Sequence, residues 1–129
     1  MKKLEHENII QAKNLFINEK FMTCFMVIEY CEWQDLKAYI RSNPQIERSE
    51  VAQILTEILK TINYMHGVGV CHRDIKPDNI LYDPVKRKIK IIDFDIAKIK
   101  KFTNSHHEMM TKTGCLSYRA PEIFNAVIP

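Results

Sequence analysis

The sequence lacks the cysteine pairs, the long apolar runs and the continuous basic face that mark several classes of protein. Its four cysteines, at positions 24, 31, 71 and 115, form no Cys-x-x-Cys pair, which argues against a zinc or thioredoxin-like site. No apolar run approaches the ~20 residues that cross a bilayer, and residues 1–10 lack the apolar core of a signal peptide. The net charge is only +3, and the basic residues form no continuous nucleic-acid-binding face. We therefore expect a cytoplasmic protein without membrane or nucleic-acid partners.

The composition is that of a folded protein. Hydrophobic residues make up 46% of the chain and charged residues 27%, which is close to the average of globular domains. A composition of this kind argues against disorder over most of the chain. The 129 residues suit one domain or part of one.

The strongest secondary-structure signal is a helix over residues 50–65. Apolar residues recur there at three- and four-residue steps, which makes one apolar stripe that we expect to pack in the core. Ser49 is the predicted N-cap, and Gly67 is the predicted stop. A shorter helix is predicted from Asp35, as its cap, to a point before Pro44.

Short strands are predicted on both sides of these helices. The apolar run 24–30 predicts a strand, and an earlier strand is expected within 9–17, with a turn at 18–20 between them. Two further strands, 80–82 and 89–92, are joined by a turn that Asp83-Pro84 begins. Residues 93–118 read as a long polar segment, which is usually functional or disordered, and 120–124 opens another helix.

The stretch from 72 to 79, HRDIKPDN, and the stretch IIDFD at 91–95 carry the chemistry. The predicted hairpin between them brings Asn79 and Asp93 to one mouth, and their oxygens suit Mg²⁺ better than zinc. Lys76 could hold a phosphate oxygen, and Asp74 could accept a proton from an attacking hydroxyl. Any one of these residues alone would be an ordinary turn former or cap. Their combination and order indicate phosphoryl transfer.

These motifs resemble those of eukaryotic protein kinases of the serine/threonine type. HRDIKPDN resembles the catalytic loop, DFD the metal-binding triplet, and APE at 120–122 the end of the activation segment. The resemblance covers essentially the whole chain. It implies a partial kinase-like α+β fold: the end of the N-lobe sheet over 1–28, the hinge over 29–35, and over 36–129 the first half of the mainly helical C-lobe, with catalytic loop and activation segment.

The resemblance also implies roles for individual residues, with ATP and Mg²⁺ as cofactors and a protein as substrate. Asp74 would be the proton acceptor, and Lys76 would stabilise the γ-phosphate. Magnesium would be held by Asn79 and Asp93. His72 and Phe94 would stack in the hydrophobic spine that joins the lobes.

The segment VIEYCEWQDL resembles the kinase hinge. Glu29 and Cys31 would give backbone hydrogen bonds to adenine, and Asp35 would lie near the ribose. Ile28 would be the gatekeeper and Leu81 would lie beneath the adenine ring, although both also read as ordinary core residues.

Regulation by phosphorylation is a further implication of the resemblance. Arg73 would receive a phosphate from the activation segment, with Thr111 and Thr113 as candidate sites. Both threonines also read as unmodified loop residues.

The sequence departs from the kinase pattern at two positions. Asp95 stands where the triplet usually has a glycine with unusual backbone angles. Cys115 replaces a threonine that usually contacts the catalytic aspartate and lysine, and a thiol is the weaker donor.

The chain also contains no Gly-rich loop, no ATP-anchoring lysine with its glutamate partner, and no later C-lobe helices. We therefore expect a central slice of a kinase domain with little activity alone, marginal stability and an exposed part of the 50–65 stripe. The remaining kinase segments or a partner protein would then complete it. A pseudokinase-like scaffold is the alternative function, and an unrelated helical adaptor is a third reading.

Overall fold

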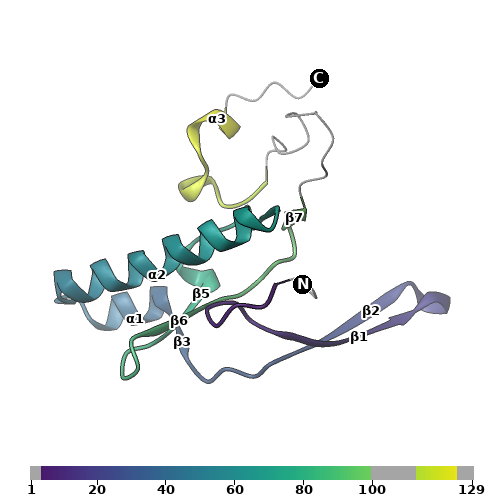
Figure 1. Ribbon diagram of the computed structural model, residues 1–129, viewed down its shortest axis with the longest axis horizontal. Coiled ribbons are helices and arrows are strands. Elements are labelled where there is room, and N and C mark those ends of the chain that lie inside the picture. The colour runs from purple at the N-terminus through teal and green to yellow at the C-terminus, as the bar shows by residue number, and fades with distance from the viewer. Residues whose placement is uncertain (1–3, 100–112, 125–129) are drawn as a thin grey trace.

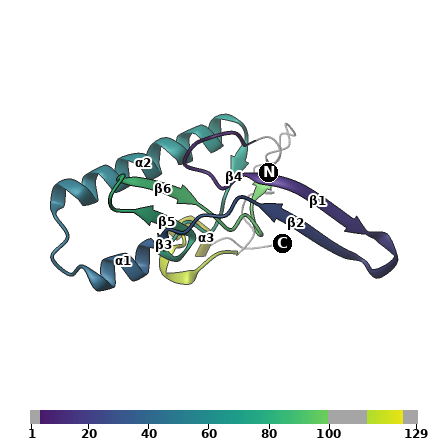
Figure 2. The same ribbon diagram turned by 90° about the horizontal axis from the view of Figure 1, so that it is seen from below.

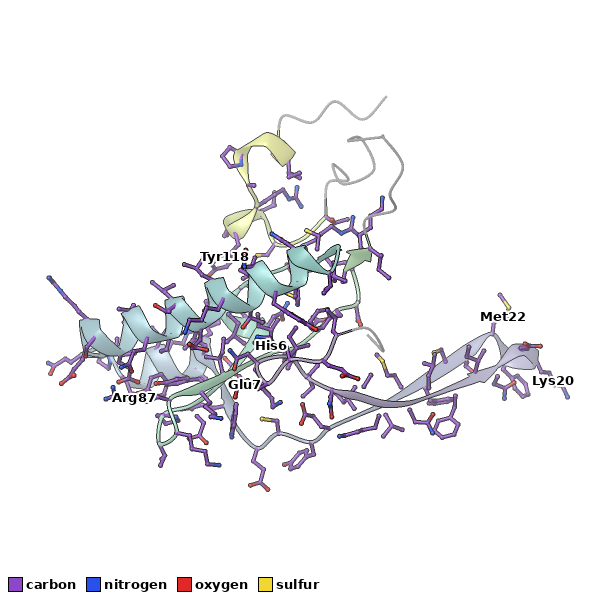
Figure 3. The ribbon with its side chains drawn as sticks, in the orientation of Figure 1. His6, Glu7, Lys20, Met22, Arg87 and Tyr118 are labelled. Carbon is purple, nitrogen blue, oxygen red and sulfur yellow. The ribbon has the colours of Figure 1, made fainter. Side chains whose placement is uncertain are left out.

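The computed structural model describes residues 4–99 and 113–124. An antiparallel hairpin of β1 (Ala12–Asn18) and β2 (Thr23–Ile28) forms the first part of the chain. The predicted turn is confirmed as a short 3-10 helix, Glu19–Phe21, where the Asn18 side chain accepts the backbone N–H of Phe21. The hairpin extends away from the helices in both views (Figures 1 and 2), with Lys20 and Met22 at its tip (Figure 3).

Two helices follow the hairpin. The helix α1 (Leu36–Ser42) begins where the sequence predicts, because the Asp35 carboxylate accepts the backbone N–H of Ala38 at 2.8 Å. The longer helix α2 spans Arg48–Gly67 and ends at the predicted glycine.

The predicted N-cap of α2 is wrong. The carbonyl of Glu47 already accepts the backbone N–H of Val51, so the helix begins before Ser49. Ser49 lies in the first turn, where its hydroxyl donates to the Glu47 carboxylate at 3.1 Å. Glu47 itself makes no side-chain capping hydrogen bond.

A three-stranded antiparallel sheet packs beside the helices. Its order is β3 (Gln34–Asp35), β5 (Ile80–Asp83) and β6 (Lys88–Ile91). The hairpin of β5 and β6 was predicted, and its pairs include Ile80 with Ile91 and Leu81 with Lys90. A second small sheet pairs β4 (Val70–Cys71) with β7 (Lys98–Ile99). The predicted α+β arrangement is confirmed (Figure 1).

The core lies between α2 and the three-stranded sheet. Met65, Ile80, Tyr82, Ile89 and Ile91 are almost completely buried there. The apolar stripe of α2 is divided, because Ile54 and Ile58 are buried whereas Leu55 and Leu59 are 52% and 65% exposed. The expectation that the whole stripe packs in the core is therefore wrong, and the expected exposure of part of it is confirmed.

The remaining elements are short. They are a 3-10 turn Pro77–Asn79, a 3-10 turn Leu116–Tyr118 and the helix α3 (Pro121–Phe124), which confirms the helix predicted at 120–124. Within the described ranges, none of the helices has the length and apolar character that crossing a bilayer requires.

Candidate active site

The β5–β6 hairpin brings the two predicted metal ligands to the same end of the sheet. Its last pair is Ile80 with Ile91, and the backbone N–H of Ile92 donates to the carbonyl of Asn79 at 3.0 Å. Asn79 is buried, and Asp93, the next residue after Ile92, is exposed. The predicted convergence of these two chain segments is confirmed at the level of the backbone.

Asp74 is the centre of a network of hydrogen bonds. Its Oδ2 accepts from Lys76 Nζ at 2.6 Å and from Asn79 Nδ2 at 2.9 Å, and its Oδ1 accepts the backbone N–H of Cys115 at 2.8 Å. Asn79 Nδ2 also donates to the Asp74 carbonyl at 3.0 Å. The structure thus brings together three of the four predicted catalytic side chains.

The electrostatics of this network keep Asp74 ionised. Burial alone would raise the pKa of the Asp74 carboxyl, but the hydrogen bonds from Lys76 and Cys115 outweigh it and leave the pKa lowered. The hydrogen bond to Asp74 in turn raises the pKa of Lys76. A carboxylate that is ionised and fixed in this way can accept a proton from a hydroxyl placed beside it.

His72 connects the Asp74 loop to the end of β6. The imidazole is 2% exposed, its Nε2 lies 2.9 Å from the Ile92 carbonyl, and its Nδ1 accepts the backbone N–H of Asp74 at 3.3 Å. These two contacts require a proton on Nε2 and none on Nδ1. Burial lowers the pKa of His72, which favours this neutral ring.

The predicted contact between His72 and Phe94 is present. Their ring centroids lie 4.6 Å apart with an interplanar angle of 58°. Each ring belongs to a different segment of the site, so the contact holds the catalytic loop against the residues that follow β6.

The unusual backbone angle in the DFD triplet belongs to Asp93. Its φ is +64°, and Arg73 in the catalytic loop has a φ of +68°. Among the described residues, Asp95 is not one of those with positive φ. In this conformation Asp95 therefore does not need the positive φ that favours a glycine at its position.

The segment around Gly114 packs closely on the catalytic loop. Gly114 has a φ of +85°, and a Cβ at this position would lie 2.3 Å from the carbonyl oxygen of Arg73. The Arg119 side chain donates to the Gly114 carbonyl at 2.8 Å. This approach carries the N–H of Cys115 to Asp74, so the contact comes from the backbone and does not depend on the cysteine side chain.

The predicted regulatory residues are only partly described. The side chain of Arg73 donates through Nε to the Ile96 carbonyl at 2.6 Å. Thr113 is half-buried and directly precedes Gly114, whereas Thr111 lies outside the described residues.

The predicted nucleotide-binding residues lie in two places. Asp35 and Leu81 are directly paired in the β3–β5 register, which puts them side by side. Glu29 and Cys31 belong to the connection that leads from β2 to β3. The Glu29 carboxylate accepts from Lys90 Nζ at 2.7 Å, a contact that sequence reasoning missed. In β6 Lys90 alternates with the buried Ile89 and Ile91, and this pattern gives no signal of a partner 61 residues away.

The donor set fits a magnesium ion. Both contacts of Asn79 Nδ2 go to Asp74, which leaves the amide oxygen for a metal, and Asp93 supplies an exposed carboxylate. Among the described residues, no cluster of three or more His, Cys, Asp or Glu side chains could hold a metal ion. Magnesium does not need such a cluster, because it keeps several waters and binds substrate phosphates.

Comparison with known proteins identifies the family. The model of the protein kinase domain matches residues 1–127. The chain is 35% identical over 126 residues to the serine/threonine-protein kinase cds1 of Schizosaccharomyces pombe, covering 98% of this chain and 26% of that protein. It is 32% identical over 122 residues to the carbon catabolite-derepressing protein kinase of Secale cereale, covering 95% and 23%. It is 35% identical over 126 residues to the serine/threonine-protein kinase RAD53 of Saccharomyces cerevisiae, covering 95% and 14%.

The chain therefore spans about a quarter or less of the length of these relatives. The match to the kinase domain agrees with a fold made of small antiparallel sheets and two main helices. The expectation of a kinase-type fold, drawn from the catalytic-loop and triplet motifs, is confirmed, and the chain belongs to the protein kinase family.

Proposed function

We propose that this chain forms the catalytic-loop side of a serine/threonine protein kinase, which transfers the γ-phosphate of ATP to a protein hydroxyl. The observation that carries the proposal is the Asp74 carboxylate, which is fixed by Lys76, Asn79 and the backbone of Cys115. Two of these donors belong to the loop of Asp74 itself, and the third comes from a segment 41 positions away. The serine/threonine kinases among the relatives support the same class of substrate.

In this proposal Asp74 accepts the proton of a serine or threonine hydroxyl. The hydroxyl oxygen forms a bond to the γ-phosphorus, the bond from that phosphorus to the β–γ bridging oxygen breaks, and ADP leaves with the electron pair. Lys76 lies 2.6 Å from Asp74, so its ammonium can contact both the base and the phosphoryl group.

We assign the metal to Asn79 and Asp93. A bound magnesium ion would neutralise charge that develops on the phosphates. The protein contributes the Asn79 amide, which is fixed by Asp74, and the Asp93 carboxylate, which follows β6 on a backbone with a φ of +64°. Close pairing between Asn79 and Ile92 keeps the two ligands at one end of the hairpin.

The nucleotide base would lie between the hinge and Leu81. In this arrangement residues 1–28 end the N-lobe, 29–35 form the hinge, and 36–129 belong to the C-lobe. The backbones of Glu29 and Cys31 would bind adenine. Asp35 uses one carboxylate oxygen to cap α1, which leaves the other for a ribose hydroxyl.

A phosphate on Thr111 or Thr113 would act through Arg73. Thr113 is next to Gly114, whose backbone packs on the Arg73 carbonyl, so a modified residue there would be close to the arginine. The cytoplasm, where ATP and protein substrates are both present, is the proposed compartment.

The first test is whether the 129-residue chain binds Mg-ATP. We expect ATP to raise the melting temperature only when magnesium is present, and expect Asp93→Asn to remove most of that effect. The second test measures phosphate transfer to a generic protein substrate, alone and after addition of a separately produced Gly-rich kinase N-lobe. We expect transfer by the chain alone to be low, because none of its three glycines forms a Gly-rich loop over the phosphates.

Asp74→Asn is the matched variant for the transfer test, because it keeps the size and shape of the side chain and removes the basic carboxylate. Transfer that survives in Asp74→Asn would contradict the role of Asp74. A chain that shows neither magnesium-dependent ATP binding nor transfer would contradict the enzymatic proposal.

A scaffold without catalysis is the second candidate function. It is favoured by the large exposed apolar side chains on the β1–β2 hairpin and along α2, among them Phe16, Phe25, Leu55 and Leu59. A negative result in both tests, together with stable complex formation by the same chain, would favour this candidate.

A further inference from the structure

The side chain of Lys90 joins three segments of the chain beside the proposed nucleotide site. Its ammonium lies 2.7 Å from Oε1 of Glu29 and donates to the carbonyl of Glu7 at 3.1 Å. Both charged side chains are largely enclosed, with 16% of Lys90 and 24% of Glu29 exposed. Figure 3 shows Glu7 in the middle of the molecule, where the N-terminal segment approaches the sheet.

Glu29 is tied to the beginning of the hairpin as well. Its carboxylate Oε1 accepts the backbone N–H of Gln11 at 2.9 Å, and its own N–H donates to the Gln11 carbonyl at 2.9 Å. Burial alone would raise the pKa of Glu29, but the hydrogen bonds from Lys90 and Gln11 outweigh it and lower the pKa. The carboxylate is therefore ionised and has two fixed donors at neutral pH.

The position of Lys90 in β6 connects this ion pair to the residues of the proposed site. Lys90 is directly opposite Leu81 in the β5–β6 register, and the same strand leads on to Asp93. Glu29 is the first residue after β2 and begins the connection that contains Cys31. A link from Lys90 to Glu29 thus sets the position of that connection relative to the strands that carry Leu81 and Asp93.

We propose that Lys90 and Glu29 are positioning residues, which hold the 29–31 backbone at the distance from β5 and β6 that a bound nucleotide requires. The proposal rests on the proposed function, since it assigns nucleotide binding to that backbone. It differs from an ordinary stabilising ion pair in its consequence: loss of the pair should weaken nucleotide binding more than it weakens folding. Neither residue contacts the reacting phosphate in this arrangement.

The test compares Lys90→Met with Lys90→Arg in the 129-residue chain. Methionine keeps the length and the apolar stem of lysine but removes the charged donor, whereas arginine keeps both charge and donor. Lys86→Met is the matched control, because Lys86 lies in the turn of the same hairpin, is 67% exposed, and pairs with Asp83 only at 3.6 Å. Glu29→Gln is the milder second variant, since its amide oxygen still accepts from Gln11 and Lys90.

The quantity to be measured is the affinity for Mg-ATP, by titration at a temperature where every variant is folded. We expect Lys90→Met to bind about tenfold more weakly, which is the loss of one charge-assisted hydrogen bond. Lys90→Arg should restore most of the affinity, Glu29→Gln should lie between the two, and Lys86→Met should match the parent chain. Equal affinity in Lys90→Met and Lys86→Met would overturn the proposal.

Hydrogen exchange at the Gln11 amide provides a readout that needs no nucleotide. That N–H is bonded to the Glu29 carboxylate, so its exchange should be several-fold faster in Lys90→Met and unchanged in Lys86→Met. Unchanged exchange in Lys90→Met would overturn the positioning role even if ATP binds. Absence of ATP binding by the parent chain, with faster Gln11 exchange in Lys90→Met, would support the role of the ion pair and contradict the proposed function instead.

Discussion

The backbone N–H of Cys115 donates to Oδ1 of Asp74 at 2.8 Å, although the two residues are 41 positions apart. The bond connects the segment around Gly114 to the catalytic loop. It helps to lower the pKa of Asp74, which keeps the carboxyl group ionised. Because the donor is in the backbone, the replacement of threonine by cysteine at this position leaves the bond in place.

Removing this N–H should raise the pKa of Asp74. Cys115→Pro deletes the donor, and the φ of −70° at Cys115 already suits a proline. Cys115→Thr keeps the N–H and is the control. We expect NMR titration of the Asp74 carboxyl to give a pKa nearer its usual range in Cys115→Pro and little changed in Cys115→Thr. A pKa that is equal in the two variants would show that Lys76 and Asn79 alone hold the carboxylate.

Gly114→Ala should weaken the contact between this segment and the catalytic loop. The added Cβ would lie 2.3 Å from the Arg73 carbonyl, and the φ of +85° disfavours any side chain. We expect the strain to cost about 1–3 kcal/mol, measured as faster exchange of the Cys115 amide or as a lower free energy of unfolding.

Gly67→Ala is the control for that variant. Gly67 is the last residue of α2, and a Cβ there has no neighbouring atom within 4 Å. We expect alanine to raise the free energy of unfolding by up to about 1 kcal/mol. A loss of stability in both variants would argue against the close approach at Gly114 as the cause.

Glu50→Gln should destabilise the junction of α1, α2 and β5. The Glu50 carboxylate accepts from Tyr39 at 2.7 Å and from Tyr82 at 2.8 Å, and these hydrogen bonds lower the pKa of Glu50. We expect a cost of about 1–2 kcal/mol in urea unfolding at pH 7. Ser49→Ala should change stability by less than about 0.5 kcal/mol, because Ser49 does not cap the helix.

The same carboxylate predicts a pH dependence. A group whose pKa is lower in the folded state stabilises the fold above its unfolded pKa and loses this contribution as the pH falls through its folded pKa. For Glu50 the loss should begin near its ordinary value of 4.5 and grow below it. The parent chain should therefore lose more stability than Glu50→Gln between pH 5 and strongly acidic conditions, and parallel pH curves would contradict this expectation.

Leu59→Lys should reduce self-association without unfolding the chain. The Leu59 side chain is 65% exposed on α2, whereas the adjacent Ile58 is 8% exposed in the core. We expect the lysine to change the free energy of unfolding by less than about 0.5 kcal/mol and to lower the apparent mass at high concentration in light scattering. Ile58→Lys is the contrasting variant and should cost several kcal/mol, about 2–7 by the transfer of an unpaired polar group.

Local signals in the sequence predicted the elements that depend on near neighbours. Asp35 caps α1 through an N–H three residues away, and the β5–β6 hairpin is specified by its own turn. The two-residue strands β3, β4 and β7 were missed, because each exists only through pairing with a distant segment, such as Val70 with Ile99. The start of α2 was misplaced because Ser49 was expected to cap the helix with its side chain. The helix begins earlier, where the Glu47 carbonyl accepts the backbone N–H of Val51.

For the candidate site, the sequence likewise predicted the nearby segments that meet but not all of the contacts between distant residues. The predicted hairpin brings Asn79 next to Ile92, the residue before Asp93, and Asn79 also contacts Asp74. The partners that fix the side chains could not be predicted in the same way. The resemblance to kinases placed residue 115 beside Asp74, but the contact comes from the backbone of Cys115. Nothing in the sequence indicated the contact of Lys90 with Glu29, 61 positions away.

The neutral imidazole of His72 has a consequence for how the chain tolerates changes in length. It fixes the Asp74 loop to the carbonyl of Ile92, at the end of the β5–β6 hairpin opposite its turn. Insertions between Asp83 and Lys88 would lengthen that turn and leave the paired end in register. A single residue inserted between Ile91 and Asp93 would move the acceptor carbonyl away from the ring and disturb both aspartates together.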